Sequence, residues 1–294
     1  MSGNTHEIVR WGQEPLAFEL SVADAALAAR ARDVFAPWPA RAGLPPAARF
    51  EITRLADAVG TAAAWQVRAG DGAGALTHSA DEALRWVELT AIQTFVPRCD
   101  GALALHGALV DFDGRALLVV GPARAGKSSL ACALWRAGGA LLTDDVALLD
   151  LVTATARPGP RRIALRAGSA HLLGDDLWSR ITSAPSSAPT DEGWCFHPCE
   201  IDGRTLPRTT RVAAVAFLER GGRPELGPAA LAPIVPARAV LALLPYVVAQ
   251  RRLDPGEAIR SIAPLAARVA AFDLARGPLE IMAERARTAL AEAP

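Results

Sequence analysis

The residues best suited to chemistry lie in one run, Gly121 to Ser128, which reads GPARAGKS. The run fits the pattern G-x-x-x-x-G-K-[ST], whose glycines let the backbone curl around an anion while successive amide groups point at a phosphate. The apolar run ALLVV precedes it and SSLACALW follows it, so the loop is expected between a strand and a helix. The N-terminus of that helix adds the positive end of its dipole. The pattern predicts a phosphate-binding loop for a nucleoside triphosphate.

The lysine of this loop is the only lysine in the chain, because 30 of the 31 basic residues are arginines. Lys127 therefore stands where phosphate chemistry requires a slim ammonium in place of a broad, planar guanidinium. We expect it to reach the β- and γ-phosphates of ATP, and we expect the Ser128 hydroxyl to ligate Mg²⁺. The residues expected to bind the nucleotide are Gly121, Pro122, Ala123, Arg124, Ala125, Gly126, Lys127, Ser128 and Ser129.

An acidic pair, Asp144-Asp145, follows in the apolar run 141–149. Two carboxylates in an apolar strand are costly to bury unless they meet cations. Since side chains alternate along a strand, one of the two is expected to meet the phosphate directly. A strand-end pair that only caps a turn is the alternative. His106 lies one strand before the loop and could accept a proton or bond a phosphate oxygen, although a histidine satisfied within the core fits the same pattern.

Two other groups of polar residues come later in the chain. Arg162 and Arg166 flank a short apolar run, where they could pair with phosphate oxygens or an acidic acceptor, or lie on a solvated face. Cys195, His197 and Cys199 give three soft ligands within five residues. A structural zinc site needs a fourth ligand at a recognisable spacing. The sequence offers none, so an ordinary loop is the better interpretation.

The elements that position these residues fall into two regions. Residues 1–98 are expected to form a small N-terminal α+β domain, and residues 99–294 an α/β catalytic domain. In the first region we expect a strand at 17–20, a helix at 24–35, strands at 49–55 and 63–69 around a turn at Gly60, and a helix at 80–95.

In the second region, strands at 102–111 and 115–120 are expected to form a hairpin, because Asp113-Gly114 is a tight-turn signal. A helix at 127–136 follows the loop, and two glycines end it. Later elements are expected at 141–149, 163–165, 212–218 and 269–274 as strands, and at 170–181, 237–249 and 278–291 as helices. The segment 183–198, rich in Ser, Pro and Gly, is expected to be a mobile loop near the acceptor entrance.

Composition narrows the classes of protein that fit. The chain has 294 residues, of which 51% are hydrophobic, as in globular proteins. Its 31 basic and 31 acidic residues give no electrostatic reason to expect a nucleic-acid or membrane partner. The longest apolar run, 239–249, is shorter than a membrane span and contains Pro245. The N-terminus lacks a signal-peptide pattern and four cysteines make no disulfide framework, so a cytoplasmic protein is expected.

The segment Leu105–Leu149, LHGALVDFDGRALLVVGPARAGKSSLACALWRAGGALLTDDVALL, resembles the catalytic domain of HPr kinase/phosphorylase and of related kinases from bacterial gene clusters. A strand with His-Gly, a hairpin, the phosphate loop, a helix and a strand with Asp-Asp follow in that family's order. The resemblance implies a carboxykinase-like fold, shared with phosphoenolpyruvate carboxykinase, in which the phosphate loop lies on a mixed sheet. It is close over these 45 residues, weaker towards the C-terminus, and loose over the first 98.

Carried over residue by residue, the resemblance implies that Asp144, His106 and Lys127 are the catalytic residues. Asp144 is then the base that takes the proton of the acceptor hydroxyl, and His106 lies beside the transferred phosphoryl group. Asp145 helps Ser128 to hold Mg²⁺. Phosphoryl transfer asks a protein mainly for positioning and charge stabilisation, which these residue types can supply.

The expected function is transfer of the γ-phosphoryl group of ATP to a serine-type hydroxyl of a peptide, a protein or a small molecule. HPr itself is not the expected acceptor. True HPr kinases carry an Arg-Gly-Leu-Gly-type segment after the Asp-Asp strand, where this chain reads GPRRIALRAGSAHLLG. The alternatives are an ATPase that drives a conformational change, a non-catalytic nucleotide-binding module that holds a biosynthetic partner, and a carboxykinase-like enzyme acting on a small acid. A homo-oligomer is compatible with the sequence.

Overall fold

The computed structural model describes residues 6–55, 64–70, 72–99, 102–218, 229–248 and 254–294, which form two compact units. Unit 1 comprises Met1–Asp100, Gly159–Ala167 and Ser179–Asp202, and unit 2 comprises Gly101–Pro158, Gly168–Trp178 and Gly203–Pro294. Unit 1 therefore contains two segments from beyond residue 98, where the sequence analysis ended the first domain. The turn expected at Gly60 lies outside the described residues.

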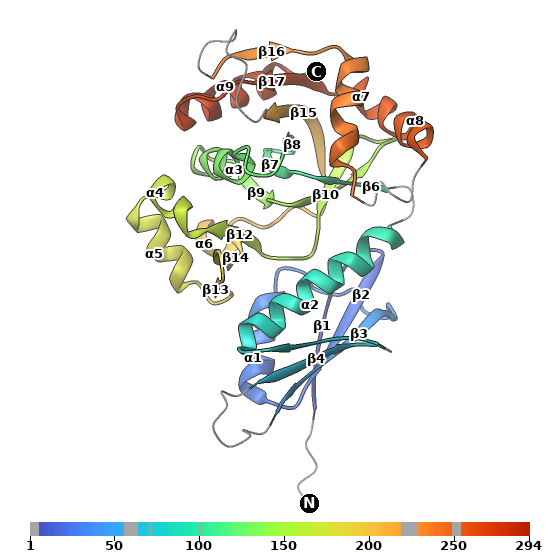
Figure 1. Ribbon diagram of the computed structural model, residues 1–294, viewed down its shortest axis with the longest axis vertical. Helices are drawn as coiled ribbons and strands as arrows, with labels where there is room; N and C mark the ends of the chain where they lie inside the picture. The colour runs from blue at the N-terminus through green and yellow to red at the C-terminus, as the bar shows by residue number, and fades with distance from the viewer. Residues whose placement is uncertain (1–5, 56–63, 71, 100–101, 219–228, 249–253) are drawn as a thin grey trace, which may run out of the picture. The chain divides into compact units, whose positions relative to one another are not determined.

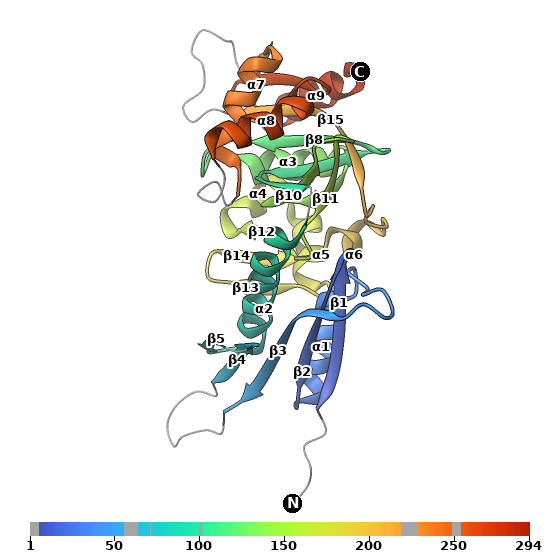
Figure 2. The same ribbon diagram turned by 90° about the vertical axis from the view of Figure 1, so that its right-hand side faces the viewer.

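Unit 1 contains a five-stranded sheet in the order β1-β2-β3-β4-β5, in which β2 and β3 are parallel and the other neighbours antiparallel (Figure 2). Its strands are β1 (Glu7–Gln13), β2 (Leu16–Val22), β3 (Pro46–Arg54), β4 (Trp65–Ala69) and β5 (Ala73–Thr77). Helices α1 (Ala25–Phe35) and α2 (Ala80–Phe95) pack against it. Side-chain caps begin both helices: Asp24 accepts from the Leu27 amide at 2.9 Å, and Ser79 accepts from the Glu82 amide at 3.1 Å.

Unit 1 has a second sheet, and two of its three strands lie where the sequence predicted a mobile loop at 183–198. Its strands, in the order β12-β14-β13, are β12 (Ile163–Arg166), β13 (Ala188–Thr190) and β14 (Gly193–Phe196), and helix α6 (Pro198–Asp202) follows. The prediction was wrong because hydrogen bonds within unit 1 satisfy the polar residues of this segment. The Glu200 carboxylate accepts from the amide of Ser186 at 3.1 Å and from its hydroxyl at 2.6 Å. Ser186 and Phe196 are fully buried.

A buried ion pair joins this second sheet to α2. The Arg162 guanidinium, only 1% exposed, donates from Nε and Nη2 to both oxygens of Glu88 at 2.8–3.1 Å, and from Nη1 to the Ser186 carbonyl at 2.7 Å. Burial by itself raises the pKa of Glu88, but the Arg162 charge and the hydrogen bonds from Arg162 together outweigh it and hold that pKa below its usual value. The pair therefore fixes Glu88 as a carboxylate inside unit 1.

His197 is a second buried ionisable group of unit 1. Its Nε2 lies 2.7 Å from the Val34 carbonyl, which can only accept, so Nε2 carries the proton in the neutral ring. Burial lowers the pKa of His197 to about 4, although the bond to Val34 and the Glu88 charge both act to raise it. The imidazole is therefore neutral in the folded unit at ordinary pH.

Unit 2 is an α/β unit with a mixed sheet of nine strands. They are β6 (Ala102–His106), β7 (Ala108–Phe112), β8 (Arg115–Val120), β9 (Ala140–Thr143), β10 (Val146–Asp150), β11 (Thr155–Pro158), β15 (Thr210–Leu218), β16 (Leu231–Pro233) and β17 (Ala270–Leu274). The order is β6-β10-β11-β15-β8-β7-β9, with β17 also paired to β15 and β16 to β17. Strands β8, β15 and β17 run parallel, so their carboxyl ends meet at one edge of the sheet.

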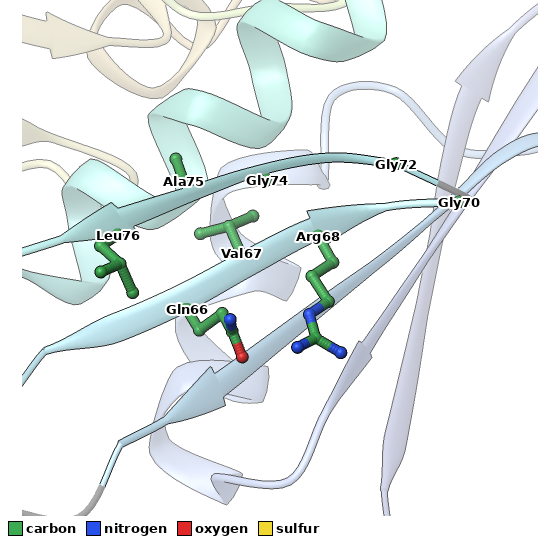
Figure 3. Close-up of a pocket in the computed structure, with 8 residues that line it drawn as sticks. All are labelled: Gln66, Val67, Arg68, Gly70, Gly72, Gly74, Ala75 and Leu76. Atoms are coloured by element: carbon green, nitrogen blue, oxygen red, sulfur yellow. The ribbon is translucent and has the colours of Figure 1, made fainter.

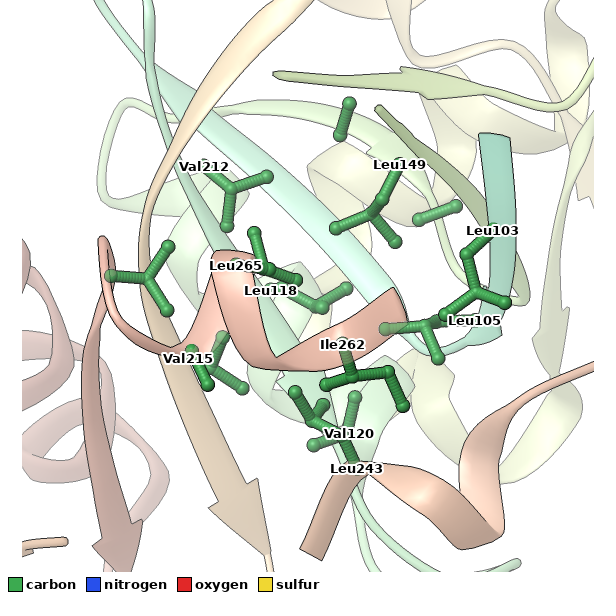
Figure 4. Packing of buried hydrophobic residues seen from close by; sticks show 14 of the residues in the cluster. Leu103, Leu105, Leu118, Val120, Leu149, Val212, Val215, Leu243, Ile262 and Leu265 are labelled. Atoms are coloured by element: carbon green, nitrogen blue, oxygen red, sulfur yellow. The ribbon is translucent and has the colours of Figure 1, made fainter. Parts of the chain in front are cut away.

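Helices cover both faces of these parallel strands. Helices α3 (Lys127–Arg136) and α9 (Leu279–Glu292) lie on one side, and α7 (Pro236–Leu243) and α8 (Pro255–Ala266) on the other (Figure 1). A hydrophobic core of unit 2 lies under α7 and α8, where Leu243, Ile262 and Leu265 pack on the apolar face of the sheet (Figure 4). The helix expected at 170–181 is divided at Gly174, φ +78°, into α4 (Ala170–Leu173) and α5 (Asp175–Ser183). No helix among the described residues has both the length and the apolarity to cross a bilayer.

Two strands expected to be continuous are each broken near the middle. The run 102–111 divides at Gly107 into β6 and β7, and the run 141–149 divides at Asp144-Asp145 into β9 and β10. The breaks face each other, because the Gly107 amide donates to the Asp145 carbonyl at 2.9 Å. Only glycine fits at position 107, since a Cβ there would lie 2.8 Å from the Val119 carbonyl oxygen. The acidic pair is thus placed in a bend between two strands.

We expect Glu88→Gln to destabilise unit 1 by about 3–5 kcal/mol, because it leaves the Arg162 charge buried without its counter-charge. Urea unfolding of the full chain, followed by tryptophan fluorescence, measures this. The matched control is Glu192→Gln, which removes the carboxylate of the exposed Arg166–Glu192 pair at 3.1 Å. That control should change the unfolding free energy by less than about 1 kcal/mol. Equal effects of the two substitutions would contradict the account of the buried pair.

The pKa of His197 also predicts a pH dependence of unit 1 stability. It is about 6.5 in an unfolded chain and about 4 in the folded unit, so between these values the unfolded chain binds more protons. The contribution of His197 to stability is complete above pH 6.5 and is lost as the pH falls to 4, by up to about 3 kcal/mol. In His197→Gln, unfolding free energies measured from pH 7.5 to 4 should fall less steeply than in the wild type. Parallel profiles would refute this.

Candidate functional site

The phosphate-loop pattern connects strand β8 to helix α3 in unit 2. Strand β8 ends at Val120 and α3 begins at Lys127, the bounds that the sequence predicted for both elements. Gly121 passes so close to β15 that a Cβ there would lie 2.5 Å from the Leu218 carbonyl oxygen. Gly126 is the N-cap of α3, with φ +103°, a conformation that side chains disfavour. Both glycines of the pattern are therefore required by the backbone itself.

Lys127 folds back onto the loop that precedes it. Its Nζ donates to the Gly121 carbonyl at 2.8 Å and to the Pro122 carbonyl at 3.2 Å, and the residue is 7% exposed. Burial lowers the pKa of Lys127, while the charges of Asp145 and Asp144 act in the opposite direction. The lysine and the acidic pair are therefore within electrostatic range of each other, although 16 residues of sequence separate Lys127 from Asp144.

The acidic pair lies in the bend between β9 and β10. Both carboxylates were expected inside one strand, with their side chains on alternate faces, and this prediction was wrong because the strand is interrupted at these two residues. Asp144 is 8% exposed and Asp145 is half-buried. The Asp145 amide donates to the Thr143 hydroxyl at 3.3 Å and its carbonyl accepts from Gly107, so the bend is fixed on both sides.

His106 ends strand β6 and contacts the acidic pair directly. Its Nδ1 lies 2.7 Å from an Asp145 carboxylate oxygen, and its side chain is 43% exposed, so it is not a core histidine. The register explains the contact, because His106 is opposite Val146 in the β6–β10 pair and therefore adjacent to Asp145. A carboxylate at this distance orients the ring and leaves the Nε2 side for another partner. The sequence analysis did not predict this pairing, although opposing the two expected strands would have suggested it.

The two arginines proposed as phosphate or acceptor ligands both belong to unit 1. Arg162 is buried against Glu88 and the Ser186 carbonyl, so it is neither on a solvated face nor offered to a ligand. The expectation for Arg162 was wrong because sequence cannot show that Glu88, 74 residues earlier, is its partner. Arg166 is exposed and pairs with Glu192 at 3.1 Å.

Sequence reasoning missed one basic residue at the loop. Arg276, just after β17, donates from Nη2 to the carbonyl oxygen of Arg124 at 3.2 Å. The strand order could have identified this residue. Strand β17 is parallel to β15, and β15 is parallel to β8, so a residue just after β17 lies at the same edge of the sheet as the start of the loop. The sequence predicted a strand at 269–274, but it did not predict which strands pair with it.

A pocket of about 490 Å³ lies in unit 1, over strands β4 and β5 (Figure 3). Arg68 and Gln66 are the polar side chains of its described lining, which is otherwise glycine and aliphatic. This lining has no carboxylate, hydroxyl or imidazole, so it lacks the groups that the loop, the acidic pair and His106 provide in unit 2. We therefore place the candidate site at Gly121–Ser129 with His106, Asp144 and Asp145.

Comparisons with known proteins give little beyond this geometry. No protein-family model matches the chain, and no curated protein matches it. A solved structure of the Hpr(Ser) kinase/phosphatase from Coxiella burnetii is similar to this one with a TM-score of 0.32 and 14% sequence identity, over 63% of this chain and 96% of that chain. A likeness of this size carries no weight for the chemistry, which depends on the arrangement of the residues themselves.

Proposed function

We propose that the chain binds Mg²⁺ and ATP at Gly121–Ser129 and transfers the γ-phosphoryl group to a serine-type hydroxyl. The observation that carries the proposal is the surroundings of Lys127. A buried ammonium lies against the carbonyls of a glycine loop at a helix N-terminus, within range of two carboxylates. An ammonium and a helix N-terminus attract the nucleotide phosphates, and carboxylates serve a metal ion or a proton.

The residues at this site fit Mg²⁺. Mg²⁺ is held in phosphoryl-transfer sites by one or two carboxylates together with substrate phosphate oxygens and water. Asp145, half-buried in the bend, and the Ser128 hydroxyl in the first turn of α3 are hard oxygen donors of the required kind. When bound, the ion neutralises charge that develops on the transferring phosphoryl group. Within the described ranges no cluster of three or more His, Cys, Asp or Glu residues suits a metal by itself.

The chain's own residues supply the remaining parts of the reaction. The acceptor hydroxyl oxygen forms a bond to the γ-phosphorus as the bond from that phosphorus to the β–γ bridging oxygen breaks, and ADP leaves. The hydroxyl proton passes to Asp144, whose carboxylate lies mostly buried in the bend between β9 and β10. Lys127 stabilises negative charge on the phosphoryl oxygens. His106, oriented by Asp145 at 2.7 Å, is the group proposed to lie beside the transferred phosphoryl group.

We propose an acceptor other than HPr, a biosynthetic precursor peptide or a small metabolite being the better candidates. The segment 159–174 differs in sequence from that of true HPr kinases, and its Arg162 is committed to Glu88. Function follows the residues of a site and not the fold that carries them. Labelled ATP incubated with the protein, a cell extract and serine peptides distinguishes the proposals. Label on a hydroxyl supports the kinase, release as inorganic phosphate alone supports an ATPase, and bound but unreacted ATP supports a nucleotide-binding module.

Asp144→Asn should bind Mg-ATP with wild-type affinity but lose transfer by about 10²–10⁴-fold, because the amide cannot accept the hydroxyl proton. Asp145→Asn should instead raise the Mg²⁺ concentration needed for half-maximal ATP binding, since one hard oxygen ligand is weakened. Calorimetric titration and ADP formation measure the two effects.

Asp150→Asn is the matched control for both variants. It lies at the far end of β10, where its side chain accepts from the amides of Val152 and Thr153 at 2.9 and 3.0 Å. Asn can still accept these bonds, so the control should leave binding and transfer unchanged. If Asp144→Asn and Asp145→Asn behave like this control, the roles assigned to the acidic pair are wrong.

A further inference from the structure

One residue of the phosphate loop has a backbone conformation that its side chain disfavours. The Ala125 amide donates to the Pro122 carbonyl at 3.1 Å, which closes a four-residue turn over 122–125. Arg124, the third residue of this turn, has φ +65°. A positive φ at that position is typical of turns that carry glycine or asparagine there. A positive φ costs free energy for an arginine, so contacts with the surrounding structure must hold Arg124 in this conformation.

Arg276 is built on a rigid part of unit 2. The Ala275 amide donates to the Ala230 carbonyl at 2.9 Å, and the Ala229 amide donates to the carbonyl of Arg276 at 3.0 Å. At the next residue, Gly277, a Cβ would lie 2.5 Å from the Ala229 nitrogen, so the two segments are in close contact. The main chain of Arg276 is therefore fixed both by β17 before it and by residues 229–230 beside it.

From this base the Arg276 side chain reaches the strained residue of the loop. Its Nη2 lies 3.2 Å from the carbonyl oxygen of Arg124. A guanidinium that donates to a carbonyl forms a charge-assisted bond, which is stronger than a neutral one. The bond thus connects a fixed point of the sheet edge to the main chain of the one residue of the turn that has a positive φ.

We propose that Arg276 is a positioning residue of the phosphate loop, which holds the turn 122–125 in the conformation from which the following amides face a phosphate. The proposal rests on the proposed function, because the position of the turn matters only if the loop binds a phosphate. Arg276 acts through the Arg124 backbone and does not itself touch the nucleotide. If residue 124 is one that adopts a positive φ readily, removal of the Arg276 side chain should therefore have little effect on nucleotide binding.

The test measures the dissociation constant of Mg-ATP by calorimetry in the wild type, Arg276→Gln, Arg124→Asn and the double variant. Arg276→Gln should bind Mg-ATP about tenfold more weakly than the wild type. Asparagine adopts the left-handed region readily, so in the Arg124→Asn background the same substitution should weaken binding by less than about threefold. Arg204→Gln is the matched control. Arg204 donates to the Gly138 carbonyl, about 15 Å along α3 from the loop, and its loss should change affinity by less than about twofold.

Three other results would overturn the inference about Arg276. Arg276→Gln binding as tightly as the wild type overturns the inference, and so does an equal loss in both backgrounds, which would mean that Arg276 contacts the nucleotide directly. A loss of the same size in Arg204→Gln overturns it as well, because the effect would then be general. If the wild type binds no Mg-ATP, the proposed function fails and this inference fails with it. If the wild type binds and only the Arg276 comparison fails, the proposed function stands.

Discussion

The burial of the Lys127 ammonium is the constraint on which the site depends. A buried ammonium must find hydrogen-bond acceptors and opposite charge, or it loses its proton. Here the Gly121 and Pro122 carbonyls accept from Nζ, and the Asp145 and Asp144 charges favour the protonated form. Each of these partners has a structural requirement of its own. The carbonyls turn inward only because the loop curls at glycine, and the carboxylates are within range only because two long strands bend.

The bend in the sheet links the acidic pair to the loop. Gly107 lets the chain pass from β6 to β7 against the Val119 backbone of β8, the strand that leads into the loop. The opposing strand bends at Asp144-Asp145, and the Gly107–Asp145 hydrogen bond ties the two bends together. His106 then faces Asp145 as a consequence of register. The facing breaks in two paired segments thus place the His106 imidazole beside the Asp144-Asp145 carboxylates.

The two units treat buried charge in different ways. In unit 1 the Arg162 guanidinium donates to both carboxylate oxygens of Glu88 and to the Ser186 carbonyl. Its charge and these donors are therefore satisfied by groups of the protein itself. In unit 2 the Lys127 charge is met by backbone carbonyls and by carboxylates at longer range. The first arrangement contributes to holding a fold together. The second leaves a cation and two carboxylates at a glycine loop, which suits a ligand of high negative charge.

The features of the structure that could be predicted are those that leave a pattern in neighbouring residues of the sequence. Elements with strong periodicity and clear ends were found with their true bounds, among them α2, β8 and α3. The strand breaks at Gly107 and Asp144-Asp145 were missed because apolar residues lie on both sides of each break. At Gly107 the close approach of the Val119 backbone, which local sequence does not show, accompanies the break. The order in 183–198 and the burial of Arg162 were missed for a related reason. Their partners, Glu200 and Glu88, are distant or unremarkable in sequence, and no local pattern pairs them.

The most direct test of the account compares two glycines at opposite ends of α3. Gly126 has φ +103° and Gly138 has φ +101°, and an added Cβ would meet nothing within 4 Å at either position. Alanine at either site should therefore cost a similar amount of stability, about 1 kcal/mol. Only Gly126 lies in the phosphate loop, so Gly126→Ala should weaken Mg-ATP binding at least about tenfold while Gly138→Ala leaves it unchanged. Equal Mg-ATP affinities in the two variants would contradict the claim that this loop binds the nucleotide.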